Sequence, residues 1–167
     1  MPDTAENLQH AFEGESQAST TYQAFARKAD KEGYPQVAKL FRAAAMAEIV
    51  HARNHLEVMD GVKSTQDNLK EAISGENMEH VSMYPEFVEQ AKQEKMPKAE
   101  RTFDWARKVE MIHESLYKSA LETLQGSGKF QDTDFYVCDV CGYTAEGEAP
   151  EKCPVCGSPK TKFFKVD

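Results

Sequence analysis

The chain has 167 residues, of which 40% are hydrophobic and 29% are charged, a composition typical of a globular protein with one substantial core. Its formal net charge of -8 argues against nucleic acids and anionic membranes as partners, because both carry negative charge themselves. No apolar run approaches the roughly 20 residues that cross a bilayer, and the first ten residues lack the features of a signal peptide, so we expect a cytoplasmic protein.

Apolar residues at helical spacing predict four long helices joined by short loops. Pro35 and Pro97 suit the first turn of the second and fourth helices, and Ser64 or Thr65 can cap the third. Short loops make successive helices antiparallel, so we expect a four-helix bundle over residues 1–128. The four helices are expected at about residues 4–31, 35–60, 65–95 and 97–125.

The predicted helices contain an internal repeat. The dipeptide Gly14-Glu15 recurs as Gly75-Glu76, and the remaining matches share a common offset that is one position longer. The first two helices therefore look like a diverged copy of the last two. The longer offset pairs Tyr22 with Tyr84, Pro35 with Pro97, Phe41 with Phe103, Ala44 with Ala106, Glu48 with Glu110 and His51 with His113.

The polar residues of this repeat form a pattern of metal ligands. Two helices each supply one glutamate, and the other two each supply a Glu-x-x-His motif, whose two ligands share one helix face. This set suits a pair of iron or manganese ions. The alternative is a set of structural ion pairs, but four carboxylates in one core would repel one another without a cation. The predicted ligands are Glu15, Glu48, His51, Glu76, Glu110 and His113.

Glu79 breaks the symmetry of the repeat, because its counterpart is Gln17 or Ala18. It lies one helical turn after Glu76, so we expect it to border the metals as a seventh ligand and not to be a solvated surface carboxylate. Tyr22 and Tyr84 can donate hydrogen bonds to ligating carboxylates, or they are packing aromatics. Three histidines without a repeat partner are expected outside the ligand set: His10, His55 and His80, with His10 and His80 on the surface or at caps.

Residues 129–167 differ in character and read as short strands and turns around a metal. Four cysteines form two Cys-x-x-Cys pairs separated by eleven residues, and in a reducing compartment they are expected to bind a metal and not to form disulfides. A glycine after each pair lets backbone N–H groups point at sulfur. Four thiolates alone do not choose between zinc and iron. The four ligands are Cys138, Cys141, Cys153 and Cys156.

The whole chain resembles the rubrerythrin family, in which a ferritin-like di-iron bundle precedes a rubredoxin-like segment. The resemblance implies a mainly α fold, with a four-helix bundle over 1–128 and a small β metal-binding domain over 129–167. The eleven-residue cysteine spacing is that of such fused segments. The resemblance rests on the stretches AFEGES, AKLFRAAAMAEIVHARNH, GENMEHVSMYPEF, EMIHESLY and YVCDVCGYTAEGEAPEKCPVCG, which occur in the family's order.

The resemblance also implies a function, since rubrerythrins are non-haem peroxidases that reduce hydrogen peroxide to water in oxidative-stress defence. Two iron ions would occupy the bundle and one iron the four-cysteine site, where recombinant protein can hold zinc. One bundle iron would move between His51 when reduced and Glu79 when oxidised, and Tyr22 and Tyr84 would steady the carboxylates. The implied catalytic residues are thus Glu79, His51, Tyr22 and Tyr84.

Electrons would come from a rubredoxin or an NAD(P)H-dependent reductase and pass through the four-cysteine iron to the bundle. The resemblance implies a homodimer, head-to-tail or with helices swapped between subunits. Two other classes remain open. An iron-storage or ferroxidase protein would need neither the cysteine module nor Glu79, and a zinc-stabilised binding or sensor protein would hold structural metals only.

Overall fold

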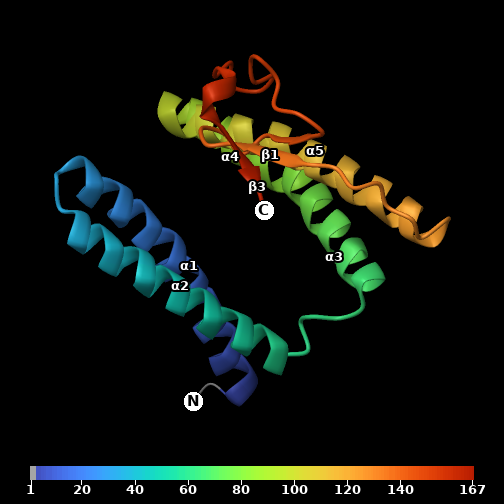
Figure 1. Cartoon of the computed structure of the whole chain (residues 1–167), viewed down its shortest axis with the longest axis horizontal. Coiled ribbons are helices and arrows are strands. Elements are labelled where there is room, and N and C mark those ends of the chain that lie inside the picture. Colours follow the sequence, from blue (N-terminus) through green and yellow to red (C-terminus); the bar gives the residue numbers. More distant parts are fainter. Residues whose placement is uncertain (1–2) are drawn as a thin grey trace. The chain divides into compact units, whose positions relative to one another are not determined.

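The computed structural model describes residues 3–167 and divides the chain into two compact units, one ending at Lys63 and one running from Ser64 to Asp167 (Figure 1). The first unit contains two helices, and the second contains the remaining helices and a small sheet. No helix in this described part is long and apolar enough to cross a membrane.

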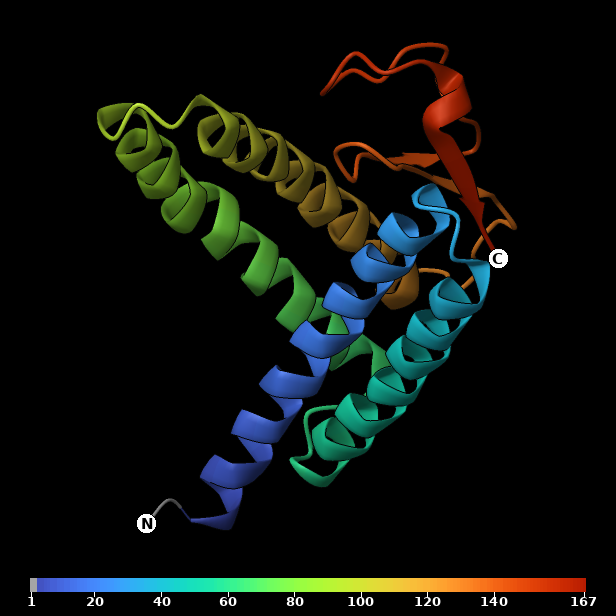
Figure 2. The same cartoon turned by 90° about the vertical axis from the view of Figure 1, so that its left-hand side faces the viewer.

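The first unit is an antiparallel helical hairpin of α1 (Thr4–Lys31) and α2 (Pro35–Val58) (Figures 1 and 2). The Asp3 side chain accepts a hydrogen bond from the Glu6 amide and so caps α1. Buried alanines let the two helices pack closely. The predicted extent of α1 is confirmed, and α2 ends two residues earlier than expected. The small core of the hairpin consists of Ala26, Ala29 and Ala38, with Phe41 packed against it.

The helices of the second unit are two antiparallel rods. The first rod consists of α3 (Thr65–Met78), a π-helical segment η1 (Glu79–Met83) and α4 (Tyr84–Gln93), and the second is α5 (Pro97–Gln125). Ser64 is the cap of α3, because its hydroxyl accepts a hydrogen bond from the Asp67 amide. The single helix predicted for 65–95 is therefore confirmed almost in full, but its π-helical segment was not predicted.

The C-terminal part is a three-stranded antiparallel sheet with the order β2-β1-β3. A short 3-10 helix, η2 (Lys160–Lys162), precedes the last strand. The sheet confirms the predicted small β region, and the mainly α fold class with it. It belongs to the same compact unit as α3 to α5, and a domain boundary at residues 128 and 129 stays a prediction. The strands are β1 (Phe135–Cys138), β2 (Thr144–Glu146) and β3 (Phe163–Val166).

Candidate metal centres

The helical hairpin of the first unit brings together three of the predicted ligands. Glu15 lies on α1, and Glu48 and His51 lie one turn apart on α2. One ligand atom from each lies within 4.8 Å of the other two, which is close enough for a single ion to contact all three. The Nδ1 atom of His51 lies 2.7 Å from an Oε atom of Glu48. We call these residues the hairpin triad.

The second unit repeats this arrangement. Glu76 on α3 faces Glu110 and His113 on α5, and their ligand atoms also lie within 4.8 Å of one another. The Nδ1 atom of His113 lies 2.8 Å from an Oε atom of Glu110 and 3.8 Å from an Oε atom of Glu76. Glu79, the predicted seventh ligand, is not among the residues whose ligand atoms cluster here, although burial and the negative charge of Glu110 both raise its pKa. The repeat in the sequence is therefore also a repeat of two ligand clusters.

The second triad favours a bound cation on electrostatic grounds. Burial, followed by the hydrogen bond and charge of Glu110, raises the pKa of Glu76 to about 7. The metal-free protein therefore keeps a proton among these carboxylates at pH values where a solvated glutamate has lost it. A cation would replace that proton, and a mixed set of carboxylate and imidazole ligands suits iron or manganese. The residues present thus fit the metal pair that the pattern predicts.

We expect Glu76→Gln to flatten the pH dependence of stability in the metal-free protein. A folded-state pKa of about 7 against an ordinary 4.5 means that the folded chain binds the extra proton, so wild-type stability falls as the pH rises through this interval. His113, whose pKa its hydrogen bond to Glu110 raises, acts in the same direction. After discounting for solvent screening, the Glu76 contribution is about 1 kcal/mol.

Thermal unfolding of metal-free protein at pH 5 and pH 8 tests this expectation. The loss of melting temperature between the two pH values should be about 2–4 °C smaller in Glu76→Gln than in the wild type. Glu86→Gln, at an exposed position of α4, is the matched control and should behave like the wild type. An equal loss in Glu76→Gln and wild type would contradict a shared proton at Glu76.

The repeat extends to two matching clusters of aromatic rings, which lie between α1 and α2 in one unit and between α4 and α5 in the other. The closest ring pair has a centroid separation of 5.5 Å in both units, and the other equivalent pairs lie 6.1 to 6.4 Å apart. The two halves therefore share their packing as well as their ligands. The clusters are Tyr22, Phe25 and Phe41 in the first unit and Tyr84, Phe87 and Phe103 in the second.

The π-helical segment η1 explains why the match at Gly75-Glu76 falls one position short of the offset that the other matches share. Tyr22 comes seven positions after Glu15, but Tyr84 comes eight positions after Glu76. An extra residue in an α-helix would rotate everything after it by about 100°, whereas a π-helical turn absorbs it. Glu79 is the first residue of η1, so the acid without a counterpart lies where the extra residue is accommodated.

The two predicted tyrosines belong to the two aromatic clusters. Burial and then the charges of Glu79, Glu110 and Glu76 raise the pKa of Tyr84. Within residues 3–167, both Tyr22 and Tyr84 contact the other rings of their clusters. Hydrogen bonding of their hydroxyls to ligating carboxylates stays a prediction.

His80 was not expected to have a partner, but it forms a buried pair with Glu114. Its Nε2 lies 2.7 Å from an Oε atom of Glu114, and the two side chains are only 13% and 11% exposed. Asn77 and Lys118 also donate to Glu114, at 2.9 and 2.8 Å, and Lys118 and then His80 lower its pKa to about 2. This network ties η1 to α5. A surface or capping role for His80 is thus wrong, and none of the ligand clusters found in residues 3–167 includes His80, His10 or His55.

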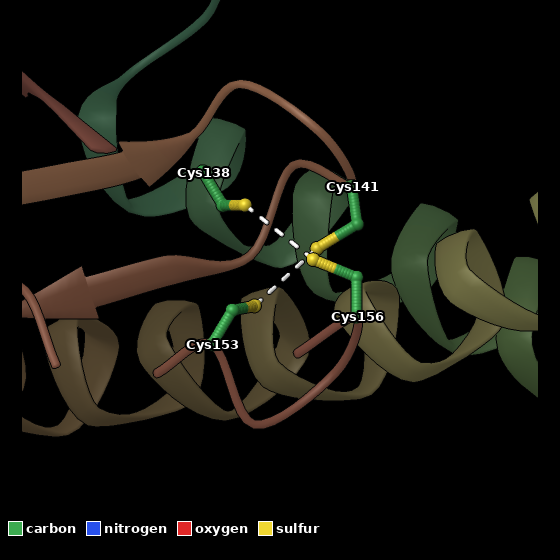
Figure 3. A group of neighbouring side chains, drawn as sticks. All are labelled: Cys138, Cys141, Cys153 and Cys156. Atoms are coloured by element: carbon green, nitrogen blue, oxygen red, sulfur yellow. Dashed lines mark hydrogen bonds between the residues drawn. The ribbon is translucent and has the colours of Figure 1, made fainter. Parts of the chain in front are cut away.

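The four cysteines converge from two loops in the C-terminal part, and their Sγ atoms face one another (Figure 3). The Sγ atoms of Cys138 and Cys156 are 3.7 Å apart, and those of Cys141 and Cys153 are 3.6 Å apart. These separations are too long for a disulfide. They match the sulfur spacing of about 3.8 Å in a tetrahedron with metal–sulfur bonds of about 2.3 Å. The four thiols therefore fit a single tetrahedral metal ion.

The two cysteine loops are built alike. The amides of Gly142 and Gly157 each donate to the carbonyl of the first cysteine in their own pair, at 2.9 Å. Both glycines have positive φ, +82° and +77°, which explains why glycine follows each pair. As expected, backbone amides also reach the sulfur atoms: those of Val140 and Cys141 donate to the Sγ of Cys138.

The four thiols differ in how readily they lose the proton that a metal replaces. Burial raises the pKa of Cys156, but hydrogen bonds from the Ser158 hydroxyl and amide outweigh it and lower that pKa to about 7. Burial raises the pKa of Cys141, so a metal must displace its proton. The site therefore gains its full set of thiolates only together with a cation.

Comparison with known proteins agrees with both centres. The family model described as Rubrerythrin matches residues 6–121, and that described as Rubrerythrin, rubredoxin-like domain matches 136–164. The chain is 36% identical to Rubrerythrin-2 of Clostridium acetobutylicum, over 96% of this chain and 95% of that protein. It is 34% identical to Nigerythrin of Nitratidesulfovibrio vulgaris, over 96% and 85%.

Solved structures show the same relationship. The structure titled "Partially Reduced State of Nigerythrin" matches with a TM-score of 0.59 and 33% identity, over 99% of this chain and 88% of that one. The "Fully reduced state of nigerythrin (all ferrous)" matches equally well, with the same TM-score, identity and coverage. These likenesses confirm the predicted fold class of a ferritin-like bundle with a small rubredoxin-like domain.

Proposed function

Since the chain belongs to the rubrerythrin family, whose members are generally di-iron proteins of oxidative stress, we propose that it is a peroxidase that reduces hydrogen peroxide to water. The family has a di-iron site of carboxylates and histidines and a four-cysteine rubredoxin-like site, and both ligand sets occur in this chain. The observation that carries the proposal is this combination of two carboxylate–histidine triads with a tetrahedral cluster of thiols. An iron-storage protein needs only the carboxylate–histidine triads.

We propose that the hairpin triad and the second triad together complete the di-iron site, supplied by one subunit or by two subunits of a homodimer. Each triad offers one imidazole and two carboxylates, and Glu79, three residues after Glu76, would supply a further carboxylate. The proposed ligands are Glu15, Glu48, His51, Glu76, Glu79, Glu110 and His113. A pair of iron ions held by these residues would supply two electrons to the O–O bond of hydrogen peroxide, which with two protons would give two water molecules.

The two histidines of this proposed site are held with different firmness. The His51 side chain is 53% exposed and contacts Glu48 through Nδ1, whereas the His113 side chain is 25% exposed and has partners at both ring nitrogens. An imidazole with one partner is freer to leave a metal than one with two. This difference supports a site in which His51 is exchanged for Glu79 on oxidation, so that the added carboxylate balances the higher charge of the metals.

The four-cysteine site is proposed to resupply the electrons, one at a time, from a rubredoxin or an NAD(P)H-dependent reductase. Exposed apolar side chains along α2, such as Leu40, Met46 and Val58, support an assembly in which further helices cover the hairpin. We propose a homodimer, head-to-tail or helix-swapped. Four free thiols in one metal site also favour a reducing, cytoplasmic location.

Stopped-flow absorbance tests the proposed peroxidase activity. Anaerobically reduced protein with iron verified in both sites is mixed with one equivalent of hydrogen peroxide or, in parallel, dioxygen. We expect the red absorbance of the ferric four-cysteine site to appear rapidly with peroxide and far more slowly with dioxygen. Protein that stays colourless with peroxide would contradict the proposal and favour iron storage or structural metal binding.

A further inference from the structure

The imidazole of His113 is held from both sides within the second unit. Its Nδ1 faces Glu110, and its Nε2 lies 2.9 Å from the Oγ1 of Thr144, the first residue of β2. The same Thr144 hydroxyl lies 3.3 Å from the carbonyl oxygen of Gly142, to which it donates. A hydroxyl has a single hydrogen, so Thr144 accepts the hydrogen bond from Nε2–H of His113. This arrangement leaves Nδ1 as the nitrogen that faces the carboxylates.

The partner of His113 belongs to the cysteine loop. Gly142 directly follows Cys141, and it lies against α5, where a Cβ on Gly142 would be 3.9 Å from the Cγ1 of buried Val109. Thr144 and Gly142 therefore connect a candidate di-iron ligand to the residue next to a candidate thiolate ligand, through two hydrogen bonds and within one chain.

Within the described residues 3–63 of the first unit, the histidine of the hairpin triad has no such second partner. The ring of His51 contacts Glu48 through Nδ1, and no partner of its Nε2 is found in residues 3–167. The two triads are alike in ligands and in their aromatic clusters, so this difference does not follow from the repeat itself. It comes from Thr144, which belongs to the same compact unit as His113.

We propose that Thr144 is a positioning residue that fixes His113 with Nε2 protonated and Nδ1 toward Glu110, and that it couples the cysteine loop to the second triad of the same chain. Metal-binding histidines commonly use their second nitrogen in this way, and the second partner sets which nitrogen is free for the metal.

The coupling half of this inference rests on the proposed function. In the proposed reaction, an iron-loaded four-cysteine site would be oxidised by losing one electron, and the di-iron site would be reduced by gaining that electron. No atom is transferred in this step, and two such steps match the two electrons that each peroxide consumes. Thr144 neither gains nor loses an electron or a proton overall; it holds His113 and the loop in contact.

Nuclear magnetic resonance of zinc-loaded full-length protein tests the positioning role without any redox chemistry. Thr144→Val keeps the shape of the side chain and removes the hydroxyl, and Thr144→Ser restores it. We expect the Nε2–H proton of His113 to exchange with water about 10-fold faster in the valine variant, as for the loss of one hydrogen bond. The serine variant should behave like the wild type, and so should Thr102→Val, which removes an exposed hydroxyl bonded only within α5.

Peroxide oxidation of the iron-loaded, reduced variants tests the coupling. The red absorbance should appear about 10-fold more slowly in Thr144→Val, which is the lower end of the effect expected when a metal ligand loses its hydrogen-bond partner. In Thr144→Ser it should appear at the wild-type rate. Unchanged proton exchange in the valine variant would overturn the positioning role, and an unchanged colour rate would overturn the coupling. If even the wild type stays colourless while proton exchange responds as expected, the proposed function fails and the assignment of Thr144 stands.

Discussion

Glu79→Ala is expected to retain both bundle irons and to slow the reduction of hydrogen peroxide by about 100-fold. This is the upper end of the loss of activity seen when a group that supports a metal site is removed. Six ligands remain without it, because the two triads are complete in its absence. What is lost is a carboxylate whose pKa burial and Glu110 raise, and which a more highly charged metal pair would draw into its ligand set. The variant therefore separates metal binding from metal oxidation.

The measurement is the single-turnover rate with peroxide, together with iron content and helical circular dichroism. Glu79→Gln keeps the size of the side chain without its charge and should be nearly as slow as the alanine variant. Glu86→Ala, an exposed glutamate seven residues along the same helical rod, is the control and should react at the wild-type rate. A wild-type rate in Glu79→Ala would refute the proposed part of this carboxylate in oxidation.

The sequence repeat predicted more of the structure than the helical spacing of apolar residues did. Matching Glu-x-x-His motifs predicted the members of one ligand set, and the structure groups them as two triads, one in each unit, which also contain matching aromatic clusters. The sequence also contains the one-position change of offset between Glu76 and the later matches. Its cause, the π-helical segment at Glu79, was not predicted, because the residues of a π-helical turn do not differ in type from those of an α-helix.

Contacts between segments that are distant in the sequence could not be predicted from such patterns. Thr144 lies 31 residues from His113, and His80 lies 34 residues from Glu114, and neither pair belongs to the repeat. Thr, His and Glu occur in so many roles that only the folded chain shows which of them meet. The cysteine site was predictable for the opposite reason, since four cysteines in two close pairs have few other uses in a reducing compartment.

The double variant Cys153→Ser/Cys156→Ser is expected to abolish the red absorbance and to reduce steady-state peroxide turnover with an external reductase by at least about 100-fold. It removes two of the four thiolates, including the one whose pKa of about 7 makes it the most easily deprotonated. Without them the remaining pair, Cys138 and Cys141, cannot complete a tetrahedral site, and the bundle loses its proposed source of electrons.

The same variant should still consume close to one equivalent of peroxide when its bundle site has been chemically reduced beforehand, because neither triad contains a cysteine. This behaviour is the reverse of that expected for Glu79→Ala, which keeps its red absorbance but reacts slowly. Val155→Ala, within the same loop, is the control and should retain turnover. Full steady-state turnover in the double cysteine variant would mean that electrons reach the bundle directly, and the thiol cluster would then be a structural metal site.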